Sequence, residues 1–565
     1  MEKIYMIDTI GPFFTGIKKK KLNWSKIPFY YLEKQDLSQK KIQKIVGYFK
    51  IFIEKAKDMG YNAVSVDELC YMVDFDFYDP DLKKKIQRYR ELYNEIFKIA
   101  VESQMKIFVT TDIMFYNDSI ESYLKNTKIT ETELLMEGII RLFDFFPMVE
   151  GVIFRIGESD GVETIGKFKS KIFLKRKKQA NSFIKKLLLI FEERSKYLIF
   201  RTWTVGAYEV GDLMWNENTY GDVFRGIDSE NFIISMKFGD ADFFRYLNLN
   251  SQFFVDGKKK IIELQTRREY EGFGEFPSFV GWDYQDYYEK IKQNSSLVGI
   301  TVWCQTGGWS NFKNLTFIKE SSFWNELNTY TTVQIFKNGK SVEEAVGEFV
   351  PTVSRDRMME FLKISDEVIK ELLYDPNYSR LKLYFNKVRV PTVIHIFWNN
   401  VTITDFTVAF YRNFCQDPES SIEIGYKALK KIDKLNRIAR ENEIDCYDYA
   451  FHYDTFYLLL KSRELIYFDL NRECIKEFKT MVKKYRSDYP YAYRFRVKLS
   501  KKKKNKIFLP LIRLLVRRKK EYRLQDKILF NKFTSPIYLS IYKTAKKKFP
   551  KFLDNQGMPF ETLFK

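Results

Sequence analysis

The first 340 residues predict a (β/α)8 barrel, an α/β fold in which eight parallel strands close on themselves. Eight short, apolar, β-prone runs recur along this part of the chain. Amphipathic helical stretches separate most of them, and no Gly-x-Gly-x-x-Gly follows the first run. Alternating strands and helices imply a parallel sheet, and eight units in roughly 300 residues fit a closed barrel better than an open, doubly wound sheet.

The eight runs have the length and residue types of buried strands. They lie at residues 4–7, 62–66, 106–110, 151–155, 197–201, 232–236, 260–264 and 298–303. The helical stretches have apolar residues three and four apart, and lie at residues 40–57, 83–102, 132–145, 173–194 and 284–293. We therefore expect a barrel domain over residues 1–340.

After residue 338 the pattern becomes helical, and no further strand is expected. Ser341 can cap the next helix, with Glu344 at its third position. We interpret residues 341–490 as an all-α domain and residues 491–565 as a separate, strongly basic and partly amphipathic C-terminal segment.

Composition excludes several classes of protein. Apolar residues make up 45% of the 565-residue chain, which is too rich in core formers for a disordered protein. Five scattered cysteines without Cys-x-x-Cys spacing argue against a disulfide framework or a zinc site, and favour a cytoplasmic location. The start of the chain lacks a signal-peptide core. No cofactor or metal is expected, and His395 and His452 are interpreted as structural.

The net charge of +21 is concentrated at one end of the chain. Residues 491–565 carry 22 Lys and Arg against 4 Asp and Glu, so the remainder is nearly neutral. Residues 498–520 read KLSKKKKNKIFLPLIRLLVRRKK, an apolar stretch between basic flanks that can lie on an anionic membrane surface. The alternative is a helix packed on the body with a solvated lysine face. Nucleic-acid binding is disfavoured because no recognition motif accompanies the charge.

Polar residues are abundant immediately after the strands, where the active site of a parallel barrel lies. The carboxylates and cations among them are Arg155, Glu158, Asp160, Arg201, Lys237, Asp240, Asp242, Glu263 and Glu269. Such a set suits cleavage of a glycosidic bond, in which one carboxylic acid protonates the leaving oxygen and another carboxylate activates water or attacks the anomeric carbon. The cations suit an anionic substrate group.

Structural explanations compete with these roles. Glu158 is either a catalytic acid or a solvated carboxylate, and Asp242 and Glu269 are either catalytic or partners that orient Arg201 and Lys237. Glu263 lies inside its strand and is interpreted as structural. Three further residues are candidate substrate contacts, with packing or solvation as the alternative: Trp203, Asp67 and Asp112.

Two motifs resemble the α-glucuronidases of glycoside hydrolase family 67. KFGDADF, at residues 237–243, is similar to the family's Lys-Asn-Gly-Pro-Ile-Asp-Phe, and ELQTRREY, at residues 263–270, to its Glu-Leu-Gln-Ile-Thr-Gln-Glu-Tyr. RTWTV at residues 201–205 resembles the family's Arg-Ala-Phe-Val-Tyr. The resemblance extends over residues 55–350, and the family's N-terminal β domain has no counterpart because the first strand begins at residue 4.

The resemblance implies an inverting hydrolase acting on a uronic-acid-bearing or related glycan. Asp242 and Glu269 would be candidate bases and Glu158 the general acid, whereas Arg155, Arg201 and Lys237 would bind the uronic acid carboxylate. The family's acid lies in Lys-Ala-Asp-Ser-Glu-Gly, and RIGESDG shifts the glutamate by one position, so Asp160 is the alternative acid. The rival interpretation is an inactive barrel that binds or scaffolds polysaccharide at the inner membrane surface.

Overall fold

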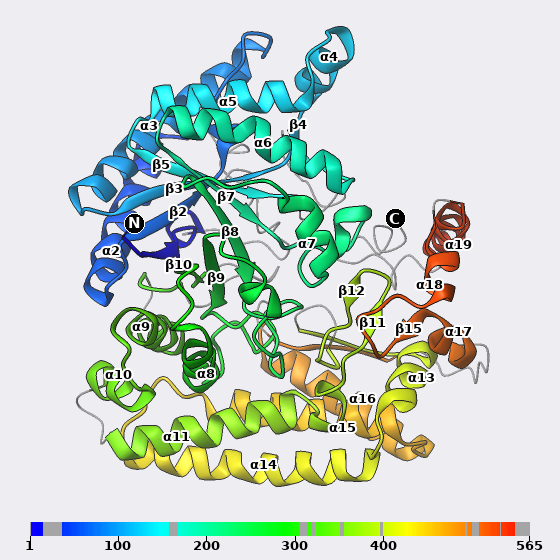
Figure 1. Cartoon of the computed structure of the whole chain (residues 1–565). Coiled ribbons are helices and arrows are strands. Elements are labelled where there is room, and N and C mark those ends of the chain that lie inside the picture. The colour runs from blue at the N-terminus through cyan, green and yellow to red at the C-terminus, as the bar shows by residue number, and fades with distance from the viewer. Residues whose placement is uncertain are drawn as a thin grey trace.

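A closed barrel of parallel strands forms the centre of the computed structural model (Figure 1). The structure describes residues 2–14, 37–157, 168–305, 315–318, 322–350, 355–395, 399–491, 494–499, 508–531 and 533–548. The strand order is β1-β10-β9-β8-β7-β5-β3-β2. Their bounds are β1 (Ile4–Asp8), β2 (Ala63–Asp67), β3 (Lys106–Asp112), β5 (Val149–Arg155), β7 (Tyr197–Arg201), β8 (Phe232–Lys237), β9 (Lys260–Gln265) and β10 (Leu297–Trp303). All eight predicted strands are present, so the predicted barrel is confirmed.

The polarity of the barrel interior changes along the strands. Every second side chain of a strand points inward. Towards the amino ends the interior is apolar, formed by Ile4, Met6, Ala63, Phe108, Ile153, Ile199, Ile233 and Ile261. Two or four positions further along the same strands the residues are polar, namely Asp8, Asp67, Asp112, Arg155, Arg201, Lys237, Glu263 and Gln265. The barrel interior therefore has an apolar layer towards the amino ends of the strands and a polar layer at their carboxyl ends.

Helices surround the barrel (Figure 1). They are α2 (Gln39–Met59), α3 (Pro80–Glu102), α4 (Asp118–Asn126), α5 (Glu131–Phe145), α6 (Lys177–Glu193), α7 (Glu217–Phe224), α8 (Gly281–Ile291) and α9 (Phe323–Asn338). Local chemistry explains their ends: Gly60, at φ 109°, ends α2 in the left-handed conformation, and Thr130 and Glu133 form a capping box at the start of α5. The helices predicted between strands are confirmed. A two-stranded sheet of β4 (Phe115–Tyr116) and β6 (Lys169–Ser170) lies outside the barrel.

A helical region follows the barrel, as predicted. Ser341 and Glu344 form the expected capping box at the start of α10. The helices are α10 (Val342–Phe349), α11 (Arg355–Val368), α12 (Pro376–Ser379), α13 (Asp405–Phe414), α14 (Pro418–Glu441), α15 (Tyr449–Tyr467) and α16 (Arg472–Asp488), and a π-helical turn at Ile369–Leu373 follows α11. Helices α11, α14 and α15 pack together along the lower edge in Figure 1.

The helical region also contains short strands, which the sequence did not predict, and some of them pair with the basic C-terminal segment. Short strands β11 (Tyr384–Phe385), β12 (Val388–Arg389) and β13 (Asn400–Ile403) lie between the helices. Strand β13 pairs with β14 (Arg496–Leu499), and β11 pairs with β15 (Val516–Arg517). Backbone hydrogen bonds to distant strands therefore integrate the C-terminal segment into the fold. Its helices are α17 (Phe508–Leu515), α18 (Leu524–Leu529) and α19 (Ser535–Lys548), and α17 packs on α13.

Among the residues that the structure describes, no helix has the length and hydropathy needed to cross a bilayer.

Candidate active site

Asp242 is the centre of a hydrogen-bonded group at the carboxyl end of the barrel. Lys237, the last residue of β8, places Nζ 2.5 Å from Oδ1 of Asp242, and the backbone N–H of Phe243 donates to the same oxygen at 2.9 Å. The hydroxyl of Tyr270, from the loop after β9, donates to Oδ2 at 2.7 Å. The Asp242 side chain is 21% exposed, so the carboxylate is held in place and still reaches solvent.

This environment holds Asp242 in its anionic form. Burial alone would raise the pKa of Asp242, but the charge of Lys237 and the hydrogen bonds from Lys237 and Tyr270 lower it below its usual value. The pKa of Tyr270 is raised well above its usual value by burial and by the charges of Asp242 and Glu269. A carboxylate that stays ionised beside a neutral phenol can accept a proton, which suits a general base.

Aromatic rings surround the cation of this group. Nζ of Lys237 lies 4.5 Å from the ring centroid of Trp203 and 4.3 Å from that of Phe243. Trp203 follows β7, so two neighbouring strands contribute to one contact. The rings stabilise the ammonium through cation–π attraction while keeping its stem dry. The predicted sugar-stacking role of Trp203 stays a prediction, because one face of its ring already meets Lys237.

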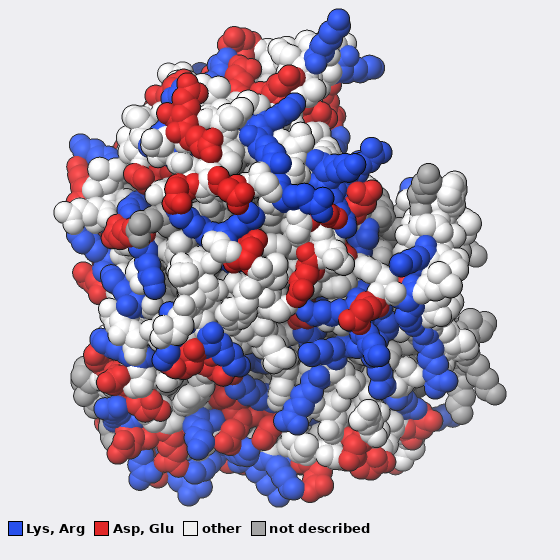
Figure 2. All heavy atoms as spheres, in the orientation of Figure 1, with Lys and Arg blue, Asp and Glu red and all other residues white. Residues whose placement is uncertain are grey.

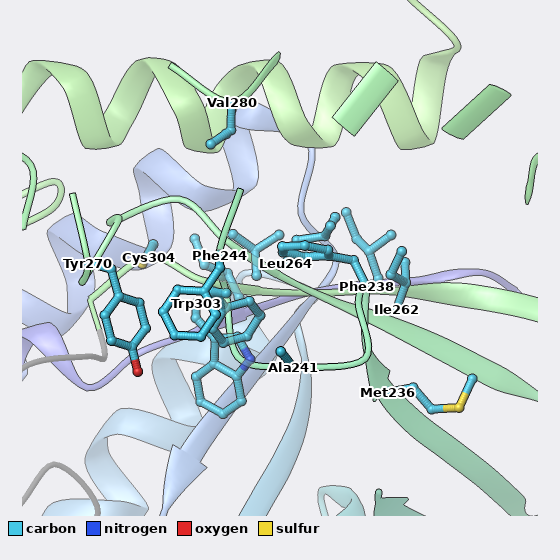
Figure 3. Packing of buried hydrophobic residues seen from close by; sticks show 14 of the residues in the cluster. Met236, Phe238, Ala241, Phe244, Ile262, Leu264, Tyr270, Val280, Trp303 and Cys304 are labelled. Carbon is cyan, nitrogen blue, oxygen red and sulfur yellow. The ribbon is translucent and has the colours of Figure 1, made fainter. Parts of the chain in front are cut away.

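Glu269 lies beside Tyr270 in the loop after β9. Gln265, at the end of β9, donates through Nε2 to Oε1 of Glu269 at 3.0 Å, and its Oε1 accepts from the backbone N–H of Glu269 at 3.2 Å. The residue is 8% exposed. Because Asp242 and Glu269 both raise the pKa of Tyr270, the structure brings the two predicted bases to the same phenol. Figure 3 shows the Tyr270 ring beside Phe244, with its hydroxyl directed away from the labelled aliphatic side chains.

Arg201 is paired with a carboxylate inside the barrel, and its predicted contact with substrate stays a prediction. Its Nε and Nη2 donate to the two carboxylate oxygens of Glu263, both at 2.8 Å. Ser235 and the indole of Trp303 donate to the same carboxylate. Burial raises the pKa of Glu263, but the charge and hydrogen bonds of Arg201 outweigh it and lower that pKa. We therefore assign Arg201 and Glu263 a structural role, which agrees with the interpretation of Glu263 from sequence.

Arg155 is likewise paired with carboxylates of the protein. The guanidinium, 1% exposed at the end of β5, binds three carboxylates: Asp112 at 2.7 Å, Asp67 at 3.0 Å and Glu68 at 3.3 Å. These residues end β2 and β3 or follow directly. Charge-assisted contacts of this kind join neighbouring strand ends. Arg155, Asp67 and Asp112 were expected to touch substrate, and in the structure they bind one another.

The helical region supports the loop that carries Glu269 and Tyr270. Arg245, 2% exposed, binds Glu271 of this loop as well as Asp283 in α8 and Asp366 in α11. Nε2 of His395 lies 2.7 Å from the carbonyl oxygen of Tyr270. Sequence reasoning missed this network. The available signal was the density of charge in TRREYEG, directly after an apolar strand.

A hairpin from the helical region holds the loop after β8. Arg389 of β12 forms an ion pair with Asp240, and the hydroxyl of Tyr384 donates to the other oxygen of Asp240 at 3.1 Å. Asp240 precedes Asp242 by two positions, so the hairpin fixes the backbone that presents the candidate base. This connection was not predicted, because Arg389 is distant from the barrel in sequence.

Glu158 and Asp160 lie outside the described residues. Among the described residues, no group of three or more His, Cys, Asp or Glu side chains has the arrangement of a metal site.

Comparisons with known proteins do not assign the chain to a family. No protein-family model and no curated protein matches it. Similar solved structures include a GH138 enzyme targeting pectin rhamnogalacturonan II, with a TM-score of 0.45, 9% identity, and coverage of 85% of this chain and 61% of that one. CpGH84B has a TM-score of 0.39, 11% identity, and coverage of 86% and 72%. A Thermobaculum terrenum O-GlcNAc hydrolase mutant has a TM-score of 0.38, 10% identity, and coverage of 88% and 94%.

The chain thus spans about three fifths of the GH138 enzyme, at 61%. The identities and TM-scores of all three are too low for an inference about activity, and the barrel is established by the strand order itself.

Proposed function

We propose that the chain is an inverting glycoside hydrolase acting on a uronic-acid-bearing or related glycan, with Asp242 as the base. The observation that carries the proposal is the state of Asp242. Lys237 and Tyr270 hold its carboxylate anionic at the carboxyl end of the barrel, and Glu269 lies beside the same tyrosine. Active sites of such barrels lie at this end.

The proposed reaction is a single displacement. Asp242 removes a proton from water, the water oxygen attacks the anomeric carbon, and a protonated carboxylic acid donates its proton to the departing glycosidic oxygen. A lowered pKa suits the base rather than the acid. We assign the acid to Glu158, with Asp160 as the alternative, and expect it about 6.5 to 9.5 Å from the base. Glu269 is the alternative base.

Lys237 is the proposed contact for a substrate carboxylate. An ammonium has three N–H donors, and the described hydrogen bonds of Lys237 use one, to Asp242. Arg155 and Arg201 are bound to carboxylates of the protein, so they do not enter this proposal. Selectivity for an anionic sugar then rests on a single cation beside the reacting bond.

The test is turnover of aryl glycosides, with and without uronic acids, by the full-length protein and two variants. D242N should lower kcat by about 10² to 10⁴-fold, because it removes the base while keeping the side-chain shape. E269Q tests whether Glu269 is the base instead of Asp242. D286N, in an exposed pair with Lys290, is the matched control and should leave kcat unchanged. Full activity of both D242N and E269Q would eliminate these residues from the mechanism.

The second candidate function is a catalytically inactive barrel that binds or scaffolds polysaccharide at a membrane surface. It is supported by the ion pairs that Arg155 and Arg201 form with carboxylates of the protein. These charged residues at the carboxyl end of the barrel stabilise the fold. Polysaccharide binding that D242N leaves intact, without turnover of any glycoside by the wild type, would favour this function over hydrolysis.

A further inference from the structure

The C-terminal segment exposes a concentration of large apolar side chains. Leu511 and Leu514 lie three positions apart on α17, with exposed fractions of 38% and 40%. Leu524 and Ile528, four positions apart on α18, are 76% and 57% exposed. Side chains at these spacings share one face of a helix. Phe533 and Ile537, at 74% and 59%, continue the apolar surface towards α19. Single exposed apolar residues are ordinary, but a group of them marks an interaction site.

Basic side chains accompany this apolar surface. The exposed cations are Arg513, Arg518, Lys519 and Lys527. The only acidic residues in the sequence from 508 to 548 are Glu521 and Asp526, and Asp526 is buried against Arg523. Figure 2 shows Lys and Arg gathered between the barrel and the lobe of α18 and α19, whose visible surface is mainly uncharged. Mixed apolar and basic character is typical of a surface that meets anionic lipid.

A cavity of about 340 Å³ lies within this basic segment. It is lined by Val516, Arg517, Arg518, Lys519, Glu521, Tyr522 and Arg523. Of these cations, Arg523 is balanced by Asp526, so the charge of Arg517, Arg518 and Lys519 is opposed in the lining only by Glu521. The residues that line the cavity therefore carry a net positive charge, and its volume admits a small anionic group.

Arg517 contributes a buried charge to the lining of the cavity. It is 2% exposed, and its Nη1 donates to the carbonyl oxygen of Asn386 at 2.6 Å, while Nε has no partner among the described residues. The guanidinium stacks 4.4 Å from the ring centroid of Tyr522. Within the described part of the chain it forms no ion pair. The charge is stabilised by backbone carbonyl oxygens, aromatic rings and the nearby charge of Asp526, so an entering anion would add a direct charge-assisted contact.

We propose that α17, α18 and the basic turn between them dock on an anionic phospholipid bilayer, with a headgroup phosphate entering the cavity beside Arg517. The apolar side chains enter the interface, and Arg518 and Lys519 meet neighbouring headgroups. A soluble anion would account for the cavity but not for the exposed leucines of α17 and α18. The proposal stands apart from the proposed hydrolase, because none of its residues belongs to the catalytic group.

Docking would also position the barrel. The hydroxyl of Tyr522 donates to Asp212 at 2.6 Å, and Nζ of Lys520 lies 3.8 Å from Asp240. Asp212 and Asp240 belong to the loops after β7 and β8, the strands that supply Trp203 and Lys237 to the candidate site. The docked protein would therefore hold the carboxyl end of the barrel near the lipid surface.

The test is flotation of the full-length protein with phosphatidylcholine vesicles, with and without phosphatidylglycerol. We expect binding only to the vesicles that contain phosphatidylglycerol. R518Q/K519Q should weaken binding by about fivefold for each charge removed, and L524S/I528S by at least about fivefold. The matched controls lie on α6, where Lys185, Lys186 and Leu189 are exposed: K185Q/K186Q and L189S should bind as the wild type does.

The remaining outcomes overturn the proposal. Equal binding to neutral vesicles would show that binding does not require an anionic headgroup. Saturable binding of inorganic phosphate, measured by calorimetry, without vesicle binding would assign the cavity to a free anion. Loss of RNA binding in R518Q/K519Q, without vesicle binding by the wild type, would assign the surface to nucleic acid. R517Q tests whether the cavity takes part in vesicle binding. Because Arg517 is buried, the thermal unfolding of this variant would be measured as well, to separate lost binding from lost folding.

Discussion

The hydroxyl of Tyr270 donates a 2.7 Å hydrogen bond to Oδ2 of Asp242, whose other oxygen binds Lys237. The tyrosine comes from the loop after β9, and the aspartate and lysine from β8 and its following loop. Two neighbouring loops thus determine the protonation state of one carboxylate. The relationship explains how a carboxylate that is only partly exposed stays ionised, as the proposed base must.

Tyr270→Phe should shift the pH dependence of catalysis. The hydrogen bond from Tyr270 lowers the pKa of Asp242, so its removal raises that pKa. A base is active above its pKa, so the acidic limb of the kcat/KM profile should move to higher pH. Tyr246→Phe is the control, because that hydroxyl donates to the carbonyl oxygen of Lys370 in the helical region. An unshifted acidic limb would indicate that Tyr270 does not influence the pKa of the base.

Glu263→Gln should destabilise the barrel strongly. The substitution leaves the buried Arg201 with a neutral partner, and breaking a buried pair in this way costs about 3 to 5 kcal/mol. Denaturation by urea would measure the loss. Asp286→Asn, in an exposed ion pair, should change the free energy of unfolding by less than about 1 kcal/mol. Similar effects of the two substitutions would contradict the structural role of the Arg201–Glu263 pair.

Acidification should destabilise the fold through two buried histidines. Burial lowers the pKa of His452 to about 3, and that of His395 to about 4 despite its contact with the carbonyl oxygen of Tyr270. Between these values and about 6.5, the unfolded chain binds protons that the folded chain does not. The free energy of unfolding should therefore fall as the pH is lowered from about 6.5 towards 4.

The variant His452→Gln isolates one of these contributions. Glutamine keeps a polar partner for the Tyr447 hydroxyl but cannot be protonated. Urea denaturation at several values between pH 6.5 and 5 should show a smaller slope for the variant, by up to about 1.4 kcal/mol per pH unit. An identical slope would indicate that His452 does not change protonation on unfolding.

Arg389→Gln should lower kcat/KM by about tenfold, acting through position rather than chemistry. Arg389 binds Asp240, and its loss frees the loop that presents Asp242. Arg389→Lys should restore part of the activity because the ion pair can re-form. Arg357→Gln, in an exposed pair with Glu360, is the control. Unchanged kcat and KM in Arg389→Gln would show that the hairpin does not position the base.

The C-terminal segment shows where sequence reasoning stopped. The sequence shows its basic charge and its apolar stretch, and these predict either a membrane-surface element or a packed helix. Pairing of β15 with β11 depends on residues far apart in the chain, such as Arg517 and Asn386, which are 131 positions apart. A two-residue strand has no periodicity to detect, so its presence depends on the partner that the fold brings to it.

Sequence alone determined the barrel, the order of its elements and the layer of polar residues at the carboxyl ends. Periodicity and capping act over a few residues, so the eight strands and the Ser341 cap were predictable. Only tertiary structure decided which charges face one another. Arg201 binds Glu263, 62 positions away, and Arg155 binds Asp67, 88 positions away, because closure of the barrel sets their distance and orientation. Lys237 ends β8 and Asp242 lies in the loop that follows, so their pairing is local. Tyr270, which completes their site, comes from the loop after the neighbouring strand β9.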